Sequence, residues 1–243
     1  MIRHKGKSRT YIHNLKLASI LSFVAGIVNI TGVLSVKVLT TNVTGHFAFF
    51  SEDLSNRNYG LAVVYLLYIL SFFVGAFVSN LLVEIVLRVK PKMSYAVPII
   101  IEILILSVVG LLGSNAAMSD TNSQIIACLM LFAMGLQNSL VTKVSQSVVR
   151  TTHLTGLFTD LGIELSQLLF YRKTAEFKQL AKNIYLKLAI IVCFFLGCLI
   201  GGFVFRSFEL RTLMLAAGFL IIALFYDSLR FLFYNLKRKV QHH

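Results

Sequence analysis

The chain has 243 residues, of which 57% are hydrophobic and only 14% are charged. Soluble domains carry about 25% charged residues, so this composition excludes a soluble globular protein and indicates an integral membrane protein. The net charge of +13 does not indicate nucleic-acid binding, because the basic residues cluster at the ends of apolar segments. Such clusters are typical of the cytoplasmic loops of membrane proteins.

Six segments are apolar and long enough to be predicted as membrane-spanning helices. The basic amino terminus leads directly into the first of them, so we expect no cleavable signal peptide. In chain order the predicted spans cover residues 15–36, 61–87, 95–112, 125–141, 186–205 and 213–233. The sequence therefore predicts an all-α membrane protein that forms a single polytopic domain over residues 1–243.

One short pattern occurs twice, between spans one and two and again between spans four and five. TTNVTGHF begins at Thr40 and TTHLTGLF begins at Thr151. Asn29 and Asn138 occupy equivalent places upstream, and FFVG at Phe72 aligns downstream with FFLG at Phe194. The chain therefore consists of two copies of one unit, about residues 14–113 and 124–236. A duplicated unit with a polar, glycine-containing element in a hydrophobic chain indicates a transporter or a channel.

The charge distribution predicts the topology. If the amino terminus is cytoplasmic and the elements 40–55 and 151–170 enter the membrane without crossing it, the basic segments 88–92 and 172–187 and the carboxyl terminus are all cytoplasmic. The two units then face opposite ways. The predicted fold is therefore six transmembrane helices in a three-plus-three inverted repeat, with two short re-entrant or broken helical elements that meet near the midplane.

The duplicated elements supply the candidate substrate pathway, because three closely spaced hydroxyls offer donors and acceptors without charge. Thr44 and Thr155 are candidate N-caps of short helices after Gly45 and Gly156, with helix starts that face the centre and favour an anionic or carbonyl group. The alternative is that the threonines, like the two asparagines, only hold helices together. The predicted pathway comprises Asn29, Thr40, Thr41, Thr44, Gly45, His46, Gln137, Asn138, Thr151, Thr152, Thr155, Gly156 and Asp160.

Among ionisable groups, Glu102 lies near the centre of the third predicted span. Charged groups within spans are costly and are usually functional or paired, so Glu102 is a candidate proton relay, with structural pairing as the alternative. The three cysteines lie in apolar stretches without metal-ligand spacing. We expect no metal site, no cofactor and no enzymatic activity.

Over almost its whole length the chain resembles the YoaK-like family of bacterial inner-membrane proteins of unknown function. The resemblance rests on a Gly-x-Gln-Asn motif followed by Arg-Thr-Thr-x-x-Thr-Gly-x-x-x-Asp, carried here by Gly135, Gln137, Asn138, Arg150, Thr151, Thr152, Thr155, Gly156 and Asp160. The first half departs from the family pattern, with Asn29 in place of an aspartate and His46 in place of an asparagine. The resemblance implies a multi-pass protein of the bacterial inner membrane.

These observations favour a secondary transporter for a small molecule, with a central site formed by the two duplicated elements. Two other classes stay open, a passive channel and a non-transporting membrane protein of assembly or signalling. The expected partners are the lipid bilayer and a small-molecule substrate, with or without a coupling ion, and no nucleic acid. Both termini are expected in the cytoplasm.

Overall fold

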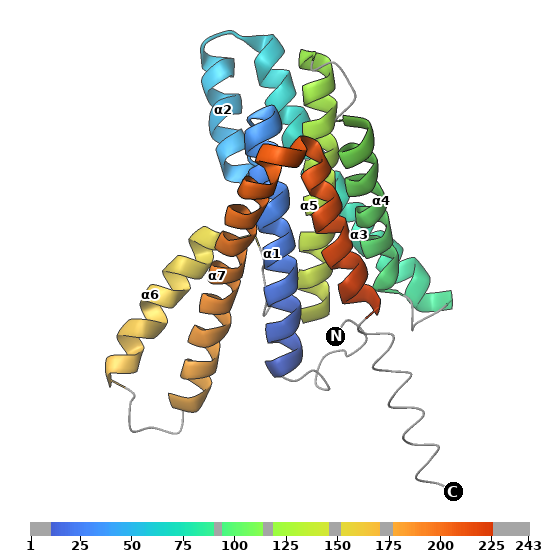
Figure 1. Cartoon of the computed structure of the whole chain (residues 1–243). Helices are drawn as coiled ribbons and strands as arrows, with labels where there is room; N and C mark the ends of the chain where they lie inside the picture. Colours follow the sequence, from blue (N-terminus) through green and yellow to red (C-terminus); the bar gives the residue numbers. More distant parts are fainter. Residues whose placement is uncertain (1–10, 90–93, 114–118, 146–151, 171–176, 226–243) are drawn as a thin grey trace, which may run out of the picture.

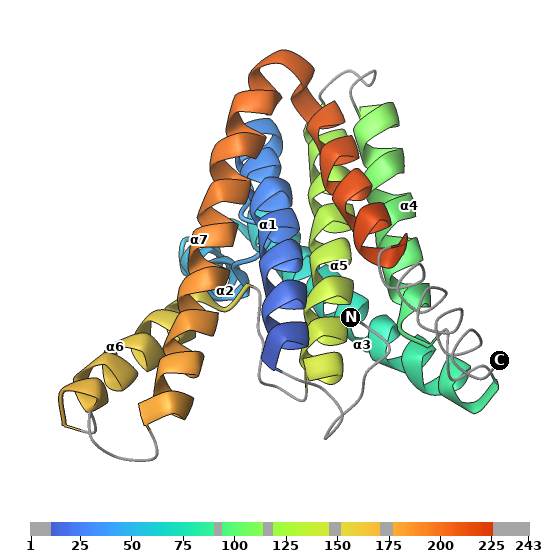
Figure 2. The same cartoon turned by 60° about the horizontal axis from the view of Figure 1, so that its bottom comes forward.

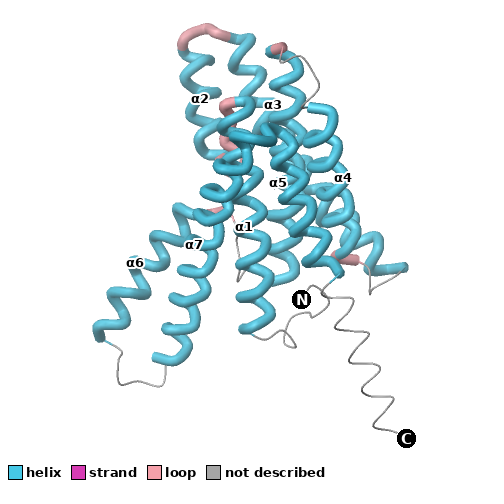
Figure 3. Tube along the Cα trace, viewed as in Figure 1, coloured by secondary structure: helices cyan, strands magenta, loops and turns pink. Residues whose placement is uncertain are grey.

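The computed structural model describes residues 11–89, 94–113, 119–145, 152–170 and 177–225. Within these ranges every regular element is a helix and no strand occurs (Figure 3). A helix pairs its backbone N–H and C=O groups internally, as a backbone without access to water requires. The all-α prediction is confirmed.

The order of the helices repeats along the chain (Figure 1). A long helix, a short helix and a second long helix come first, followed by a helix of 17 residues. The same order starts again with α5, and its last member is the helical segment 212–225. The helices are α1 (Tyr11–Val36), α2 (Val43–Ser55), α3 (Tyr59–Val89), α4 (Ala96–Leu112), α5 (Asp120–Ser145), α6 (Leu154–Phe170) and α7 (Phe177–Phe208), followed by the 3-10 turn η4 (Glu209–Arg211).

Four stretches of the described residues are long and apolar enough to cross a membrane, namely Leu15–Val36, Tyr59–Val89, Asp120–Val144 and Phe177–Phe225. The last stretch contains two helices, because the chain reverses at Glu209, whose φ is 48°, a value that non-glycine residues adopt mainly in turns. The helix α4 is apolar but shorter. The sixth predicted span, 213–233, continues beyond the described residues.

The two central helices α1 and α5 run in opposite directions, and so do α3 and α7 (Figure 1). The short helix α2 lies at the end of the molecule reached by the carboxyl end of α1, and α6 lies at the opposite end (Figure 1). In the turned view, α1 and α5 lie side by side between α7 and α4 (Figure 2). The most apolar windows of α1 and α5 are 61% buried, against 22% for α3 and for the Phe177–Phe225 stretch. The two central helices therefore form the core, and the flanking helices turn apolar side chains outward.

Glycines set the closest helix crossings. A Cβ atom on Gly26 of α1 or on Gly197 of α7 would overlap a backbone carbonyl of the other helix. The crossing of α3 with α5 has the same construction, at Gly75 and Gly135. Close backbone approach through small residues is the usual way in which helices pack in membranes. Gly26 aligns with Gly135 in the duplicated sequence, and Gly75 with Gly197, so both crossings use equivalent positions.

Candidate functional site

A cavity of about 790 Å³ lies where the starts of α2 and α6 approach the central helices. Its wall takes residues from both repeat units. The lining residues are Asn29, Leu39, Thr41, Asn42, Val43, Thr44, Gly45, Ala48, Phe72, Asn138, Thr152, His153, Leu154, Thr155 and Phe194.

Most of this wall consists of pairs that occupy equivalent positions in the duplicated sequence. The six pairs are Asn29 with Asn138, Thr41 with Thr152, Asn42 with His153, Val43 with Leu154, Thr44 with Thr155, and Phe72 with Phe194. The same part of each unit thus forms one side of the cavity. A binding site at the interface of two repeats is a feature of secondary transporters.

Seven of the predicted pathway residues lie on the cavity wall: Asn29, Thr41, Thr44, Gly45, Asn138, Thr152 and Thr155. Five others do not line it, namely Thr40, His46, Gln137, Gly156 and Asp160. The thirteenth, Thr151, lies outside the described residues. The prediction from sequence missed eight lining residues, six of which belong to the repeat-equivalent pairs: Asn42, Val43, Phe72, His153, Leu154 and Phe194. Their signal was the repeat itself, because each stands at the same position in its unit as another lining residue.

The short helix α2 begins one residue earlier than the threonine that was expected to cap it. Asn42 is the N-cap, and its Oδ1 accepts a hydrogen bond from the backbone N–H of Gly45 at 3.0 Å. Thr44 lies within the first turn of α2, and Thr155 lies in the first turn of α6. The prediction that these two threonines cap the helices is therefore wrong. Asparagine caps helices at least as well as threonine does.

The duplicated glycine makes room for the side chain that precedes the helix. A Cβ atom on Gly45 would lie 2.9 Å from Nδ2 of Asn42. A Cβ atom on Gly156 would overlap the imidazole of His153, which folds over the first turn of α6. Both helices continue through their glycine, so the glycine permits close approach and does not break the helix.

The segment between α1 and α2 turns back along α1. Lys37 has a φ of 59°, and the N–H of Val38 donates to the carbonyl of Gly32 at 3.2 Å. Nearer the start of α1 than Gly32, Oδ1 of Asn29 accepts hydrogen bonds from the backbone N–H of Thr41 at 3.3 Å and from its hydroxyl at 3.0 Å. Asn29 therefore both lines the cavity and holds the returning segment against α1.

His46 is buried behind the cavity. Its Nε2 donates to the carbonyl oxygen of Leu39 at 2.8 Å. Its ring packs against Tyr65 and Tyr68 of α3, with centroids 6.1 and 5.5 Å away. These contacts attach α2 to α3.

Two further predicted residues pack in the core. Gln137 is fully buried, and its Nε2 donates to the carbonyl of Leu21 at 2.9 Å, which joins α5 to α1. Thr40 is also fully buried. Thr40 lies against Gly32 of α1, because a Cβ atom added to Gly32 would collide with the methyl group of Thr40. Both residues support the wall without forming it.

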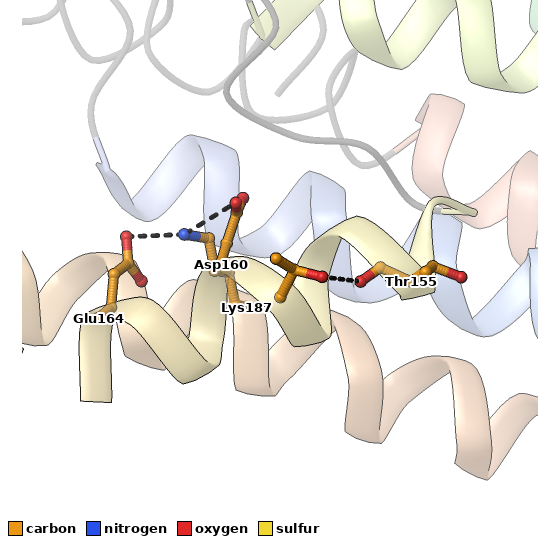
Figure 4. A network of polar contacts seen from close by, with 5 residues as sticks. Thr155, Asp160, Glu164 and Lys187 are labelled. Carbon is orange, nitrogen blue, oxygen red and sulfur yellow. Dashed lines mark hydrogen bonds and ion pairs between the residues drawn. The ribbon is translucent and has the colours of Figure 1, made fainter. Parts of the chain in front are cut away.

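Asp160 belongs to a charged cluster between α6 and α7. Nζ of Lys187 lies 2.6 Å from a carboxylate oxygen of Glu164 and 3.6 Å from one of Asp160. Figure 4 shows Lys187 of α7 beside the carboxylates of Asp160 and Glu164, with Thr155 at the start of α6. The cluster therefore ties α6 to α7 below the cavity wall.

Glu102 lies away from the cavity, on the buried face of α4. It is fully buried, and neither carboxylate oxygen has a hydrogen-bond partner among the described residues. The structural pairing considered as its alternative role is thus absent from the described part of the chain. No group of three or more His, Cys, Asp or Glu side chains suited to a metal ion occurs there either.

The apolar helices, their packing through glycines and the cavity between them define a polytopic α-helical membrane protein. Residues 17–226 match the family model described as "Protein of unknown function (DUF1275)", and the chain belongs to this family. It is 26% identical over 185 residues to the UPF0700 transmembrane protein YoaK of Bacillus subtilis (strain 168), an alignment that covers 76% of this chain and 80% of the relative. The resemblance to YoaK-like proteins is confirmed. No solved structure matches the chain significantly.

Proposed function

We propose that the protein is a secondary transporter of a small polar solute, and that the cavity is its substrate site. The six repeat-equivalent pairs on the cavity wall carry this proposal. In a transporter with alternating access, two equivalent units exchange roles around one fixed site. A site built from the same residues of both units suits such an exchange.

The proposed topology is an inverted repeat in the bacterial inner membrane with both termini in the cytoplasm. Two observations support it. The central helices α1 and α5 run in opposite directions, and α2 and α6 lie toward opposite ends of the molecule (Figure 1). The basic segments 88–92 and 172–187, which include the end of α3 and the start of α7, then share the cytoplasmic side, as positively charged segments beside membrane spans do.

The chemistry of the wall indicates the substrate class. No Asp, Glu, Lys or Arg side chain of the described residues lines the cavity, and its polar side chains are Asn, Thr and one His. The first turns of α2 and α6 both contribute to the wall, and backbone N–H groups at helix starts favour an oxygen acceptor. We propose a solute that presents a carbonyl or carboxylate oxygen and hydrogen-bonding groups to the asparagines and threonines.

Flux into proteoliposomes tests this function. The purified protein is reconstituted and assayed with a panel of radiolabelled neutral amides, amino acids and monocarboxylates, with protein-free liposomes as the control. Concentrative uptake that collapses when the ion gradient is dissipated is the expected result. Linear uptake without concentration would instead indicate a channel, and no flux across the panel would favour an assembly or signalling protein.

Replacing Thr44 or Thr155 by valine should weaken transport and leave the fold intact. Both side chains are exposed on the cavity wall and neither caps its helix, so each hydroxyl is available to the substrate. We expect each variant to lose about 0.5–1.5 kcal/mol of substrate affinity, measured as the KM of uptake, with an unchanged melting temperature. Ser51→Ala on the outer part of α2, away from the cavity, is the control. Unchanged KM in both threonine variants would remove these hydroxyls from the site.

A further inference from the structure

The two halves of the cavity differ at one equivalent contact. In the first half, Oδ1 of Asn29 accepts hydrogen bonds from the N–H and the hydroxyl of Thr41. In the second half the corresponding residues are Asn138 and Thr152, and both line the cavity. Oδ1 of Asn138 is buried and has no partner among the described residues. The asparagine thus accepts a hydrogen bond from its threonine in the first unit and does not in the second.

A buried acceptor without a partner needs an explanation, since native structures satisfy almost all such groups. The first half shows which partner the acceptor of Asn138 lacks, because the equivalent acceptor of Asn29 is bonded by Thr41. A movement of Thr152 and the start of α6 toward Asn138 would reproduce the contact of Asn29 with Thr41. The pair is uncharged, so the movement transfers a hydrogen bond and no charge.

The helices that follow these pairs are also held differently. Between α2 and α3 the contact is aromatic, with the rings of Phe49 and Tyr65 stacked at 5.3 Å. The residues at the equivalent positions of α6 and α7 are Asp160 and Lys187, which form an ion pair at 3.6 Å. The packing of α2 on α3 is also more extensive than that of α6 on α7. The closed pair therefore belongs to the firmly packed short helix, and the open pair belongs to the less packed one.

We infer that Asn29–Thr41 and Asn138–Thr152 are two equivalent latches that close in alternation, and that the structure has the first latch closed and the second open. This inference rests on the proposed transporter function and specifies its switch. With α2 toward the outside and α6 toward the cytoplasm, the structure corresponds to an inward-open state. Because the two latches make the same kind of hydrogen bond, exchanging one for the other costs little net hydrogen-bond energy.

The same substitution at the two asparagines provides the first test. Asn29→Ala removes a made hydrogen bond, so it should lower the melting temperature of the purified protein by about 2–4 °C. Asn138→Ala removes an unpaired acceptor, so it should leave the melting temperature unchanged or raise it. Equal losses in both variants would show that Asn138 already has a partner, and no loss in either would show that the first latch is not formed. Each of these results would overturn the inference.

Cysteine accessibility provides the second test and separates the inference from the proposed function. In a cysteine-free background, Thr44→Cys should be protected from a membrane-impermeant maleimide added outside, whereas Thr155→Cys should react from the cytoplasmic side. Adding Asn29→Ala should open the first latch and increase the labelling rate of Thr44→Cys several-fold. If the rate does not change, the latch inference fails and the transporter stands. If Asn29→Ala increases the labelling of Thr44→Cys from outside without slowing that of Thr155→Cys from the cytoplasmic side, the two sides open independently and alternating access itself is contradicted.

Discussion

Replacing Gly197 by alanine should strongly destabilise the protein. The added Cβ atom would overlap the backbone carbonyl oxygen of Phe23 in α1, and a backbone group cannot turn aside as a flexible side chain does. The helices α1 and α7 would have to separate along one of the two main crossings of the fold. Forced overpacking in a core typically costs 1–3 kcal/mol and sometimes more, and we expect about 3 kcal/mol here. Melting temperature and the monodisperse fraction in size-exclusion chromatography measure the loss.

Other glycines in helices supply matched controls. A Cβ atom on Gly162 of α6 or on Gly218 would meet no other atom within 4 Å. Alanine at these positions should leave stability unchanged or raise it by up to about 1 kcal/mol, because alanine favours helix more than glycine does. Gly75→Ala, at the equivalent crossing of α3 with α5, should repeat the loss seen at Gly197. A Gly197→Ala protein as stable as Gly218→Ala would contradict the packing described for α1 and α7.

Replacing Lys187 by methionine should cost about 3 kcal/mol. The side chains of Lys187 and Glu164 are only 17% and 14% exposed, and their charged atoms lie 2.6 Å apart. The substitution keeps most of the volume and leaves the carboxylate of Glu164 largely buried without its cation. Removal of one partner from a buried ion pair costs about 3–5 kcal/mol, because the other charge is left uncompensated. Thermal unfolding of the purified variant measures the effect.

A second ion pair between two helices is the control for Lys187→Met. Lys143 of α5 lies 2.7 Å from Glu84 of α3, but these side chains are 43% and 46% exposed. Lys143→Met should therefore cost less than about 1 kcal/mol. The double variant Lys187→Met/Glu164→Gln should recover most of the lost stability, since it removes the uncompensated charge. If Lys187→Met and Lys143→Met have equal effects, the buried ion pair does not hold α6 against α7 as described.

The helices themselves were largely predictable from the apolar segments. The predicted span 61–87 became α3, Tyr59–Val89, because a long apolar run has few ways to satisfy its backbone in lipid other than as a helix. The exact start of α2 was not predictable. Asn42 and Thr44 are both good capping residues, and only the backbone conformation selects the former.

The candidate site was predictable where polarity or repetition marked it. Asn29 and Thr155 stood out because each is a polar residue with a polar counterpart in the other unit, Asn138 and Thr44 respectively. Phe72 and Phe194 carried no such mark, since a phenylalanine in an apolar helix usually faces lipid or core. His46 belonged to the duplicated element but faces α3. This could not be predicted, because a sequence pattern does not specify the direction of a side chain within a short helix.

The inverted arrangement of the two units is the central claim, and two cysteines test it most directly. Arg57 lies in the exposed turn after α2, and Lys178 lies exposed at the start of α7, just beyond α6. In a cysteine-free background, a membrane-impermeant maleimide applied to intact cells should label Arg57→Cys and not Lys178→Cys. Inverted vesicles should give the opposite result. Labelling of both cysteines from the same side of the membrane would contradict the inverted repeat, and with it the alternation proposed for the cavity.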